Sequence, residues 1–179
     1  MPELPDLPDL RKSLSVPVTP EQAFRVFTER ATEWLPSGHT FLADPRSVTM
    51  EPWPGGRFYE RAADGTEATR GTVLAWAPPG RLVVTWRIGP GWRPLPDDER
   101  ASQIEAEFTA AGPDRTEVTL TYRQLHRHGE FGQQVWQAVA SASPGESLQR
   151  YADAVARHRG QRASQAPGRD TSPGGRPAR

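Results

Sequence analysis

The sequence contains no cysteine and no asparagine, and Lys12 is its only lysine. Without cysteine, the chain cannot form a disulfide, a thiolate zinc site or a cysteine nucleophile. Because lysine is so rare, nearly all the basic residues are arginines. A coding bias in the source genome explains this excess as well as any function does, so we attach no functional meaning to it.

A charge excess and long apolar runs are missing as well. The 22 basic and 22 acidic residues balance, so no overall field would draw the chain to nucleic acid or to an anionic membrane. No apolar stretch approaches the ~18 residues of a membrane span. The first residues, MPELPDLPDLRK, carry acids where a secretion signal has a basic segment. We therefore expect a cytoplasmic protein with neither a nucleic-acid nor a membrane partner.

The length of the chain and the composition of its two ends predict one domain. A chain of 179 residues is long enough for a single core. Prolines interrupt residues 1–9, and residues 160–179 have almost nothing apolar to bury, which is typical of disorder. The prediction is a single domain over residues 10–159, between a disordered arm and a disordered tail that contains arginines.

The domain is predicted to begin with a strand and one or two short helices. Residues 13–18 alternate between polar and apolar side chains, as a half-buried strand does. Thr19, Pro20 and Gln22 then form the pattern of a capped helix start. Apolar residues follow at helical spacing from Phe24 to Trp34.

The rest of the domain is predicted to be a sheet with a helical cover. Residues 46–127 alternate throughout and are interrupted by turn residues, which indicates about six antiparallel strands. Residues 133–141 suggest a helical turn or two, and Ser143 begins a second capped helix. The apolar stripe of this last helix consists of Leu148, Tyr151, Ala152 and Val155. We expect this stripe to lie against the sheet.

The glycine pair in PWPGGRFYERAADG, residues 52–65, raises the question of a phosphate-binding loop. Such a loop runs into the N-terminus of a helix, whose free N–H groups face the anion. Gly55 and Gly56 are followed instead by RFYERA, which alternates like a strand. The pair is therefore predicted to be a bend, with Asp64 and Gly65 as the hairpin turn to the next strand.

The order of these elements resembles the helix-grip, or START-like, fold. The segments TPEQAFRVFTERATEWLP, VTMEPWPGGRFYERAADGTEATRGTVLAWAPPGRLVVTW and SPGESLQRYADAV resemble the SRPBCC superfamily. Within it they resemble the branch named after the C-terminal domain of the activator of heat-shock-protein-90 ATPase. The resemblance covers residues 10–157. It implies an α+β fold in which a strongly curved antiparallel sheet of about six or seven strands wraps around a C-terminal helix.

The resemblance also implies a cavity between the sheet and that helix, which would hold an apolar or amphipathic small molecule. The residues predicted to contact this ligand are Trp34, Phe41, Met50, Phe58, Glu60, Trp86, Phe108, Tyr122, Trp136 and Tyr151. The hydroxyl groups of Tyr122 and Tyr151 would orient it, and Leu35 would help to close one end. For any one of these side chains, core packing is the simpler interpretation, because burial alone stabilises by roughly 1.5–3 kcal/mol.

Glu60 is the one acid expected to approach the interior, because it shares its strand face with Phe58. It could act as a general base, or it could pair with an arginine such as Arg70 across the hairpin. The ion pair is the expected arrangement, since structural pairs are commoner than catalytic acids.

Histidines offer the other possible chemistry. His126, His128 and Glu130 form an H-x-H-x-E pattern at the predicted end of the last strand, where alternate residues point the same way. His39 lies in another loop that we expect near the cavity mouth. No fourth ligand is evident near the H-x-H-x-E pattern, and loop histidines such as His39 are usually solvated. No metal ligand, catalytic residue or cofactor is therefore predicted.

Three functions are compatible with these observations. The leading hypothesis is a stand-alone domain, monomeric or homodimeric, that binds a small hydrophobic molecule without turnover. The first alternative is an enzyme of the polyketide cyclase/aromatase or hydrolase type that uses the same cavity. The second alternative is a co-chaperone that stimulates a heat-shock ATPase, a partner for which the sequence offers little besides the family resemblance.

Overall fold

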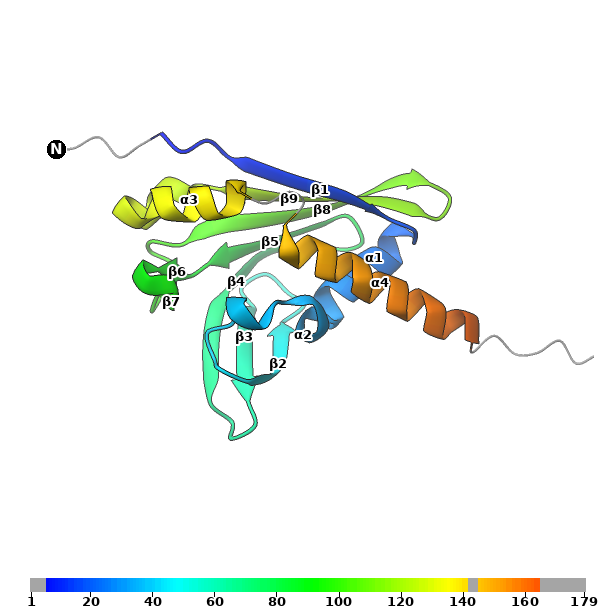
Figure 1. Cartoon of the computed structure of the whole chain (residues 1–179), viewed down its shortest axis with the longest axis horizontal. Helices are drawn as coiled ribbons and strands as arrows, with labels where there is room; N and C mark the ends of the chain where they lie inside the picture. The colour runs from blue at the N-terminus through cyan, green and yellow to red at the C-terminus, as the bar shows by residue number, and fades with distance from the viewer. Residues whose placement is uncertain (1–5, 142–144, 165–179) are drawn as a thin grey trace, which may run out of the picture.

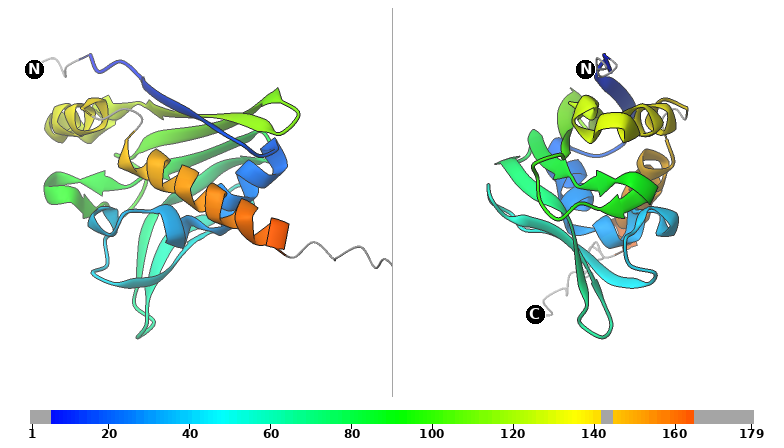
Figure 2. Two further views of the ribbon diagram at one scale, coloured as in Figure 1. Left: turned by 45° about the vertical axis from the view of Figure 1, so that its right-hand side comes forward. Right: turned by 90° about the vertical axis from the view of Figure 1, so that its left-hand side faces the viewer.

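The computed structural model describes residues 6–141 and 145–164. Its main feature is a strongly curved antiparallel sheet whose concave face is crossed by the C-terminal helix (Figures 1 and 2). The strands, in their order across this seven-stranded sheet, are β1 (Leu10–Val16), β9 (Arg115–Arg123), β8 (Ser102–Gly112), β5 (Arg81–Trp86), β4 (Glu67–Ala77), β3 (Arg57–Ala62) and β2 (Pro45–Met50). The predicted α+β helix-grip fold is confirmed.

A small ribbon and several helices complete the fold. The ribbon is formed by β6 (Ile88–Gly89) and β7 (Arg93–Pro94), with the 3₁₀ helix η2 (Pro90–Trp92) between them. The other helices are α1 (Pro20–Glu29), α2 (Ala31–Trp34), η1 (Ser37–His39), η3 (Leu125–Phe131), α3 (Gly132–Ala140) and α4 (Glu146–Ser164). Within the described residues, none of these helices has the length and apolar character that a membrane span requires.

The start of α1 follows the predicted capping box. The Thr19 hydroxyl accepts a hydrogen bond from the Gln22 backbone N–H, and the Gln22 side chain accepts one from the Thr19 N–H, both at 3.4 Å. This reciprocal pair satisfies two donors that a helix start otherwise leaves free. Arg30 leaves helical geometry, so the chain continues as a separate short helix, α2.

The glycines around β3 are required by the geometry of the sheet. Gly55 has φ 86°, a conformation that favours glycine, and the chain then enters β3, so the predicted bend is confirmed. Gly71 on β4 lies so close to β5 that a Cβ atom would be 1.9 Å from the carbonyl oxygen of Thr85. Any larger residue at position 71 would therefore push the two strands apart.

Helix α4 covers the concave face of the sheet with an apolar stripe. Leu148, Tyr151, Ala154 and Val155 are all buried, and each exposes 2% or less of its surface. Ala152, predicted to lie in this stripe, is only half-buried. The predicted cap at Ser143 lies outside the described residues. The buried side chains of α4 join those of α1, α2 and the sheet in the main core.

The ends of the domain differ from the predicted boundaries. Leu7, in the expected N-terminal arm, is buried in a second apolar cluster with Ile88, Leu125 and Val135. Helix α4 runs to Ser164, past the predicted limit of the domain at residue 159. Residues 1–5 and 165–179 lie outside the described part of the chain.

Candidate functional site

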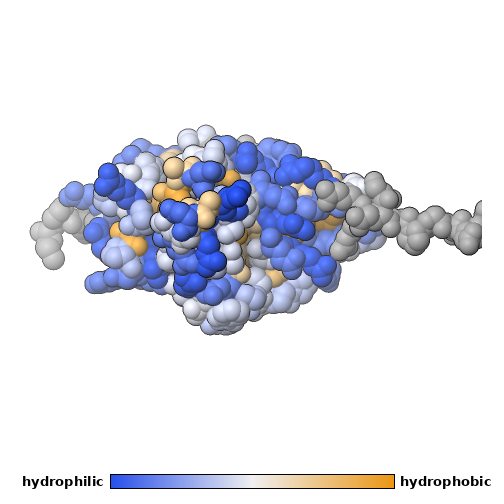
Figure 3. Space-filling model, turned by 90° about the horizontal axis from the view of Figure 1, so that it is seen from below, coloured by the Kyte–Doolittle hydropathy of each residue, from blue (hydrophilic) through white to orange (hydrophobic). Residues whose placement is uncertain are grey.

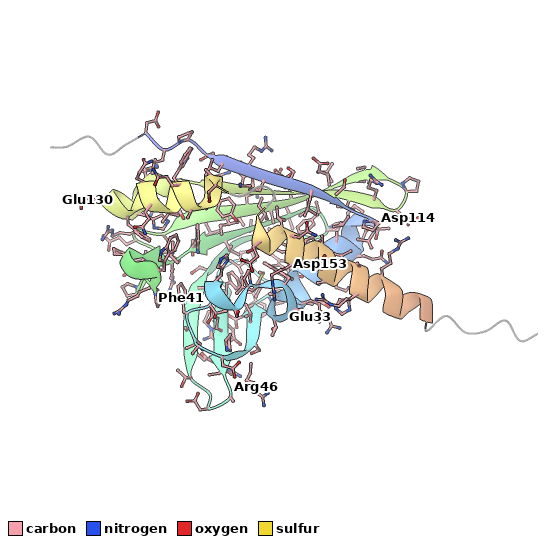
Figure 4. All side chains as sticks on the ribbon, viewed as in Figure 1. Glu33, Phe41, Arg46, Asp114, Glu130 and Asp153 are labelled. Atoms are coloured by element: carbon pink, nitrogen blue, oxygen red, sulfur yellow. The ribbon has the colours of Figure 1, made fainter. Side chains whose placement is uncertain are left out.

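A cavity of about 530 Å³ lies between the concave face of the sheet, the loop after α2 and the first turn of α4. Its volume is within the range of small-molecule sites. Figure 4 shows side chains of the sheet and of this loop reaching into the space beside α4, with Phe41 on the side near β6 and β7. Seen from below, the molecular surface is mostly hydrophilic, with apolar residues exposed in small areas (Figure 3).

The cavity wall is mainly apolar and aromatic. Six of the residues predicted from the sequence lie on it: Trp34, Phe41, Met50, Phe58, Trp86 and Tyr122. The rings of Trp86 and Tyr122 stand 5.7 Å apart between centroids, and the indole N–H of Trp34 donates to the carbonyl of Phe27 at 3.0 Å. The wall is thus held in place by ring contacts and by a satisfied buried donor.

Tyr122 brings a hydroxyl group to this wall from β9. Its O–H makes no hydrogen bond with any residue in the described ranges 6–141 and 145–164. Burial raises the pKa of Tyr122 to about 12. The phenol is therefore neutral at physiological pH and free to donate a hydrogen bond to a molecule in the cavity.

Lys12 is a cavity residue that the sequence interpretation missed. It lies on β1 with Leu14 and Val16 on the inward face, lines the cavity and exposes only 9% of its surface. No hydrogen bond or ion pair joins its ammonium group to a side chain or backbone group of the described residues. The sequence did contain a signal for Lys12. Alternate residues of a strand face the same side, so Lys12 shares the inward face of Leu14 and Val16.

Glu60 and Arg70 form a buried ion pair behind the wall, as predicted. The Arg70 guanidinium donates to Glu60 and also, at 2.9 Å, to the carbonyl oxygen of His39. The Glu60 carboxylate accepts further hydrogen bonds from the backbone N–H groups of Phe41 and Leu42 at 2.9–3.0 Å. All the strong interactions of this carboxylate are thus made within the protein, so it is not a free base.

Arg70 itself reaches the cavity from this pair. Burial lowers the pKa of Arg70, and the charge of Glu60 opposes this effect. The guanidinium also lies between the rings of Phe41 and Phe58, with its central carbon 5.2 Å and 5.3 Å from their centroids. A cation between two aromatic faces and a carboxylate is well compensated.

A family model matches residues 17–151 of the chain, which is most of the domain. It is the model of the activator of Hsp90 ATPase homolog 1-like protein. The chain belongs to this family, which is part of the SRPBCC superfamily. No curated protein is similar enough to be matched with the chain.

Several solved structures are also similar to this chain. The anthrahydroquino-γ-pyrone synthase Txn09, solved in complex with SUM, is 43% identical and matches 86% of this chain and 99% of its own, with a TM-score of 0.59. The self-sacrificing resistance protein CalC from Micromonospora echinospora is 24% identical over 85% of this chain and 96% of its own, with a TM-score of 0.62. Protein NE0264 from Nitrosomonas europaea is 17% identical over 84% and 95%, with a TM-score of 0.57. The last two show the shared fold alone.

Four of the predicted contact residues do not line the cavity. Phe108 lies deeper in the core, where its ring packs against Phe24 and Phe27. Tyr151 is fully buried, and its hydroxyl donates to the carbonyl of Ala23 at 2.8 Å, so it is not available to a ligand. Trp136 packs on the second apolar cluster, and its indole N–H donates to the Pro8 carbonyl at 3.0 Å. Glu60, as described above, stands behind Arg70.

The H-x-H-x-E pattern does not continue the last strand. Gln124 has φ 60°, and the chain turns there into the 3₁₀ helix η3, so the three side chains do not share one strand face. His126 and Glu130 are exposed, whereas His128 is buried and its Nε2 is 2.7 Å from the Ser102 hydroxyl. Among residues 6–141 and 145–164, no cluster of acids and histidines suited to a metal ion occurs.

A second hollow, of about 640 Å³, lies on the outer side of α1 against β2 and the turn before β5. Its wall includes Glu21, Arg25 and Glu29, all exposed on one face of α1. These charges are solvated and the hollow is not covered by α4. We therefore take the cavity beside Lys12 and Tyr122 as the candidate site.

Proposed function

We propose that the protein binds a planar aromatic molecule of the polyketide type in its cavity and closes an oxygen-containing ring on it. The observation that carries this proposal is an aromatic cavity with unpaired polar groups in a chain 43% identical to a γ-pyrone synthase along 99% of that protein. Flat ring systems fit walls such as those of Trp86 and Phe58, because aromatic contacts add to the burial of apolar area.

The proposed reaction is an isomerisation. A phenolic oxygen forms a bond to a carbon that is conjugated with a neighbouring ketone, and the phenolic proton leaves that oxygen. One π bond between the attacked carbon and the carbon next to the ketone breaks as the new bond forms. The carbon next to the ketone gains a proton, so the product has the composition of the substrate and no oxidant or reductant is needed. Negative charge develops on the ketone oxygen as the new bond forms, and hydrogen-bond donors at that position lower the barrier.

Tyr122 is the side chain suited to stabilise the negative charge on the ketone oxygen. Its hydroxyl is neutral, because burial holds its pKa at about 12, and it has no partner within the described residues. The apolar wall around it excludes water, which strengthens such a hydrogen bond. The same wall holds the two reacting parts of the substrate in one plane and thereby reduces the entropy cost of closure.

The test uses an anthraquinone that carries a phenolic hydroxyl next to an alkynyl ketone. Closure to the γ-pyrone leaves the mass unchanged, so the product is followed by chromatography and absorbance. We expect the protein to accelerate closure and Tyr122→Phe to slow it about 100-fold, the effect of losing an oxyanion donor. Tyr59→Phe is the matched control, because Tyr59 lies under Arg57 on the outer face of β3. Equal rates with and without protein would contradict the proposed reaction.

Binding without turnover is the second candidate function. The observation in its favour is that the fully buried carboxylate of Glu60, near the cavity, is committed to Arg70 and to two backbone N–H groups. An enzyme that must remove a proton would have to use solvent or a group at the mouth instead. Tight binding of the same probe with no acceleration of closure would select this candidate.

The co-chaperone role, which the family description suggests, stays a prediction. A pull-down from the source cell with the full chain would test it, with recovery of the heat-shock ATPase as the expected result. A variant of the surface that leaves the cavity intact would then be needed to separate the two roles.

A further inference from the structure

Within residues 6–141 and 145–164, the charge of Lys12 has no counter-charge. Lysine is rarely buried unless it is paired, because an ammonium group loses its hydration when water is removed. Lys12 exposes 9% of its surface and makes no ion pair or hydrogen bond with the described residues. Its position on the cavity wall means that a molecule in the cavity can supply the missing acceptor.

Lys12 and Tyr122 lie on the same face of neighbouring strands. In the register of β1 and β9, Lys12 stands opposite Leu120 and Leu10 opposite Tyr122. Lys12 and Tyr122 are therefore diagonal neighbours, with Cβ atoms roughly 7 Å apart, a spacing that long side chains bridge. Both line the cavity, so an ammonium group and a neutral phenol can donate to two oxygens of one ligand.

The other charged groups of the cavity wall do not compensate Lys12. Arg70 is positive and is already paired with Glu60. His39 and Glu146 lie at the mouth, where both are exposed. Glu146 belongs to the first turn of α4, where its carboxylate is solvated and favoured by the helix end.

We propose that Lys12 is the specificity-determining residue of the cavity and binds an anionic oxygen of the ligand, namely an aromatic phenolate. This inference rests on the proposed function and names the charge state of its substrate. In a phenol that stands next to a ketone, the two oxygens lie side by side. Lys12 then holds the phenolate and Tyr122 donates to the ketone oxygen. The phenolic proton passes to solvent, and the phenolate is the nucleophile in ring closure.

The test compares two small probes that differ in one methyl group. 2-Hydroxyanthraquinone can ionise, and its absorbance moves to longer wavelength when it does, whereas 2-methoxyanthraquinone cannot ionise. Both are titrated into the full chain at a pH at which about half of the free hydroxy probe is ionised. Affinity is measured by quenching of tryptophan fluorescence, and the charge state of the bound probe is read from its absorbance.

We expect the wild-type protein to bind the hydroxy probe as its phenolate and roughly 10- to 100-fold more tightly than the methoxy probe, the range for a charge-assisted hydrogen bond. Lys12→Met, which keeps the length of the side chain, should remove both the preference and the absorbance shift while still binding the methoxy probe. Lys12→Gln checks the result in case the first variant folds poorly, and Lys12→Arg should restore the preference.

Arg11→Met is the matched control. Arg11 precedes Lys12 on β1, points outward and lies near Glu107 at 3.6 Å, so its loss changes the net charge equally but leaves the cavity untouched. Binding of both probes with equal affinity by the wild type, or a preference that survives Lys12→Met and Lys12→Gln, would overturn the role of Lys12 and leave the proposed cavity function standing. Failure of both probes to bind the wild type would count against the proposed function, and the role of Lys12 would fall with it.

Discussion

Two cations line the same cavity and differ in what surrounds them. Arg70 is compensated inside the protein by Glu60, by the carbonyl of His39 and by two aromatic rings. Lys12 is almost as buried but has no such partner within the described residues. A buried charge with its own counter-ion stabilises one conformation, whereas a buried charge without one is poised to bind another molecule. Arg70 therefore has a structural role, and the proposed ligand-binding role belongs to Lys12.

The largest expected effect is the loss of the buried counter-ion. Glu60→Gln removes the charge that compensates Arg70 and should lower the free energy of unfolding by about 3–5 kcal/mol, because it leaves a cation buried alone. Urea unfolding followed by circular dichroism measures this loss. Glu67→Gln is the matched control, since Glu67 pairs with Arg57 and Arg61 on the exposed side of the same hairpin. It should lose much less stability than Glu60→Gln, because solvent screens the charges of an exposed pair.

A second measurement on this pair separates charge from packing. Replacing both partners, Glu60→Leu with Arg70→Met, removes the two charges together and should restore part of the stability lost in Glu60→Gln. If the double variant were less stable than either single variant, the pair would matter through its hydrogen bonds to residues 41 and 42 rather than through charge compensation.

His128 is a third buried titratable group, and it avoids the cost of a buried charge because its ring stays neutral. Burial lowers the pKa of His128 from its ordinary value of 6.5 to about 4. The unfolded chain takes up this proton at higher pH than the folded one, so stability falls as the pH drops from about 6.5 toward 4. The shift corresponds to about 3 kcal/mol at the acid end.

We therefore expect His128→Gln to lose less stability than the wild type between pH 7 and pH 4, by about 3 kcal/mol. Urea unfolding at the two pH values measures the difference. His126→Gln, on the same segment but exposed, is the control for the loss of a histidine. Equal acid sensitivity of the wild type and His128→Gln would mean that the folded protein accommodates the protonated ring.

The smallest expected change in stability is at Lys12. Lys12→Met removes an unpaired charge from an apolar wall and should leave the free energy of unfolding unchanged or raise it by about 1 kcal/mol. The contrast with Glu60→Gln is direct, because Glu60→Gln removes a paired buried charge behind the cavity wall and Lys12→Met removes an unpaired one on the wall. A loss of more than about 2 kcal/mol in Lys12→Met would show that Lys12 has a structural partner.

The fold was accessible from the sequence because its signals are local. The capping box at Thr19, the bend at Gly55 and the strand alternation each follow from the conformational preferences of a few neighbouring residues. The pair of Glu60 with Arg70 was also predictable, since strand parity turns Glu60 inward and a buried carboxylate needs a counter-charge.

Two properties of the candidate site could not be predicted from the sequence: how deeply a side chain is packed behind the cavity wall, and where the last strand ends. Parity placed Phe108 on the inward face but could not tell a wall residue from one packed behind it against Phe24 and Phe27. The left-handed conformation of Gln124 ended the last strand early, and glutamine gives no signal for it. Lys12 was missed because its rarity suggested a coding bias, although its inward parity on β1 was visible.

The most direct test is a crystal structure of the protein with 2-hydroxyanthraquinone. We expect the ring system between the sheet and α4, with its phenolate oxygen about 3 Å from the Lys12 Nζ atom. A phenolate turned toward Arg70 or toward solvent at the mouth would contradict the role of Lys12. A ligand bound only outside the cavity would contradict the proposed function itself.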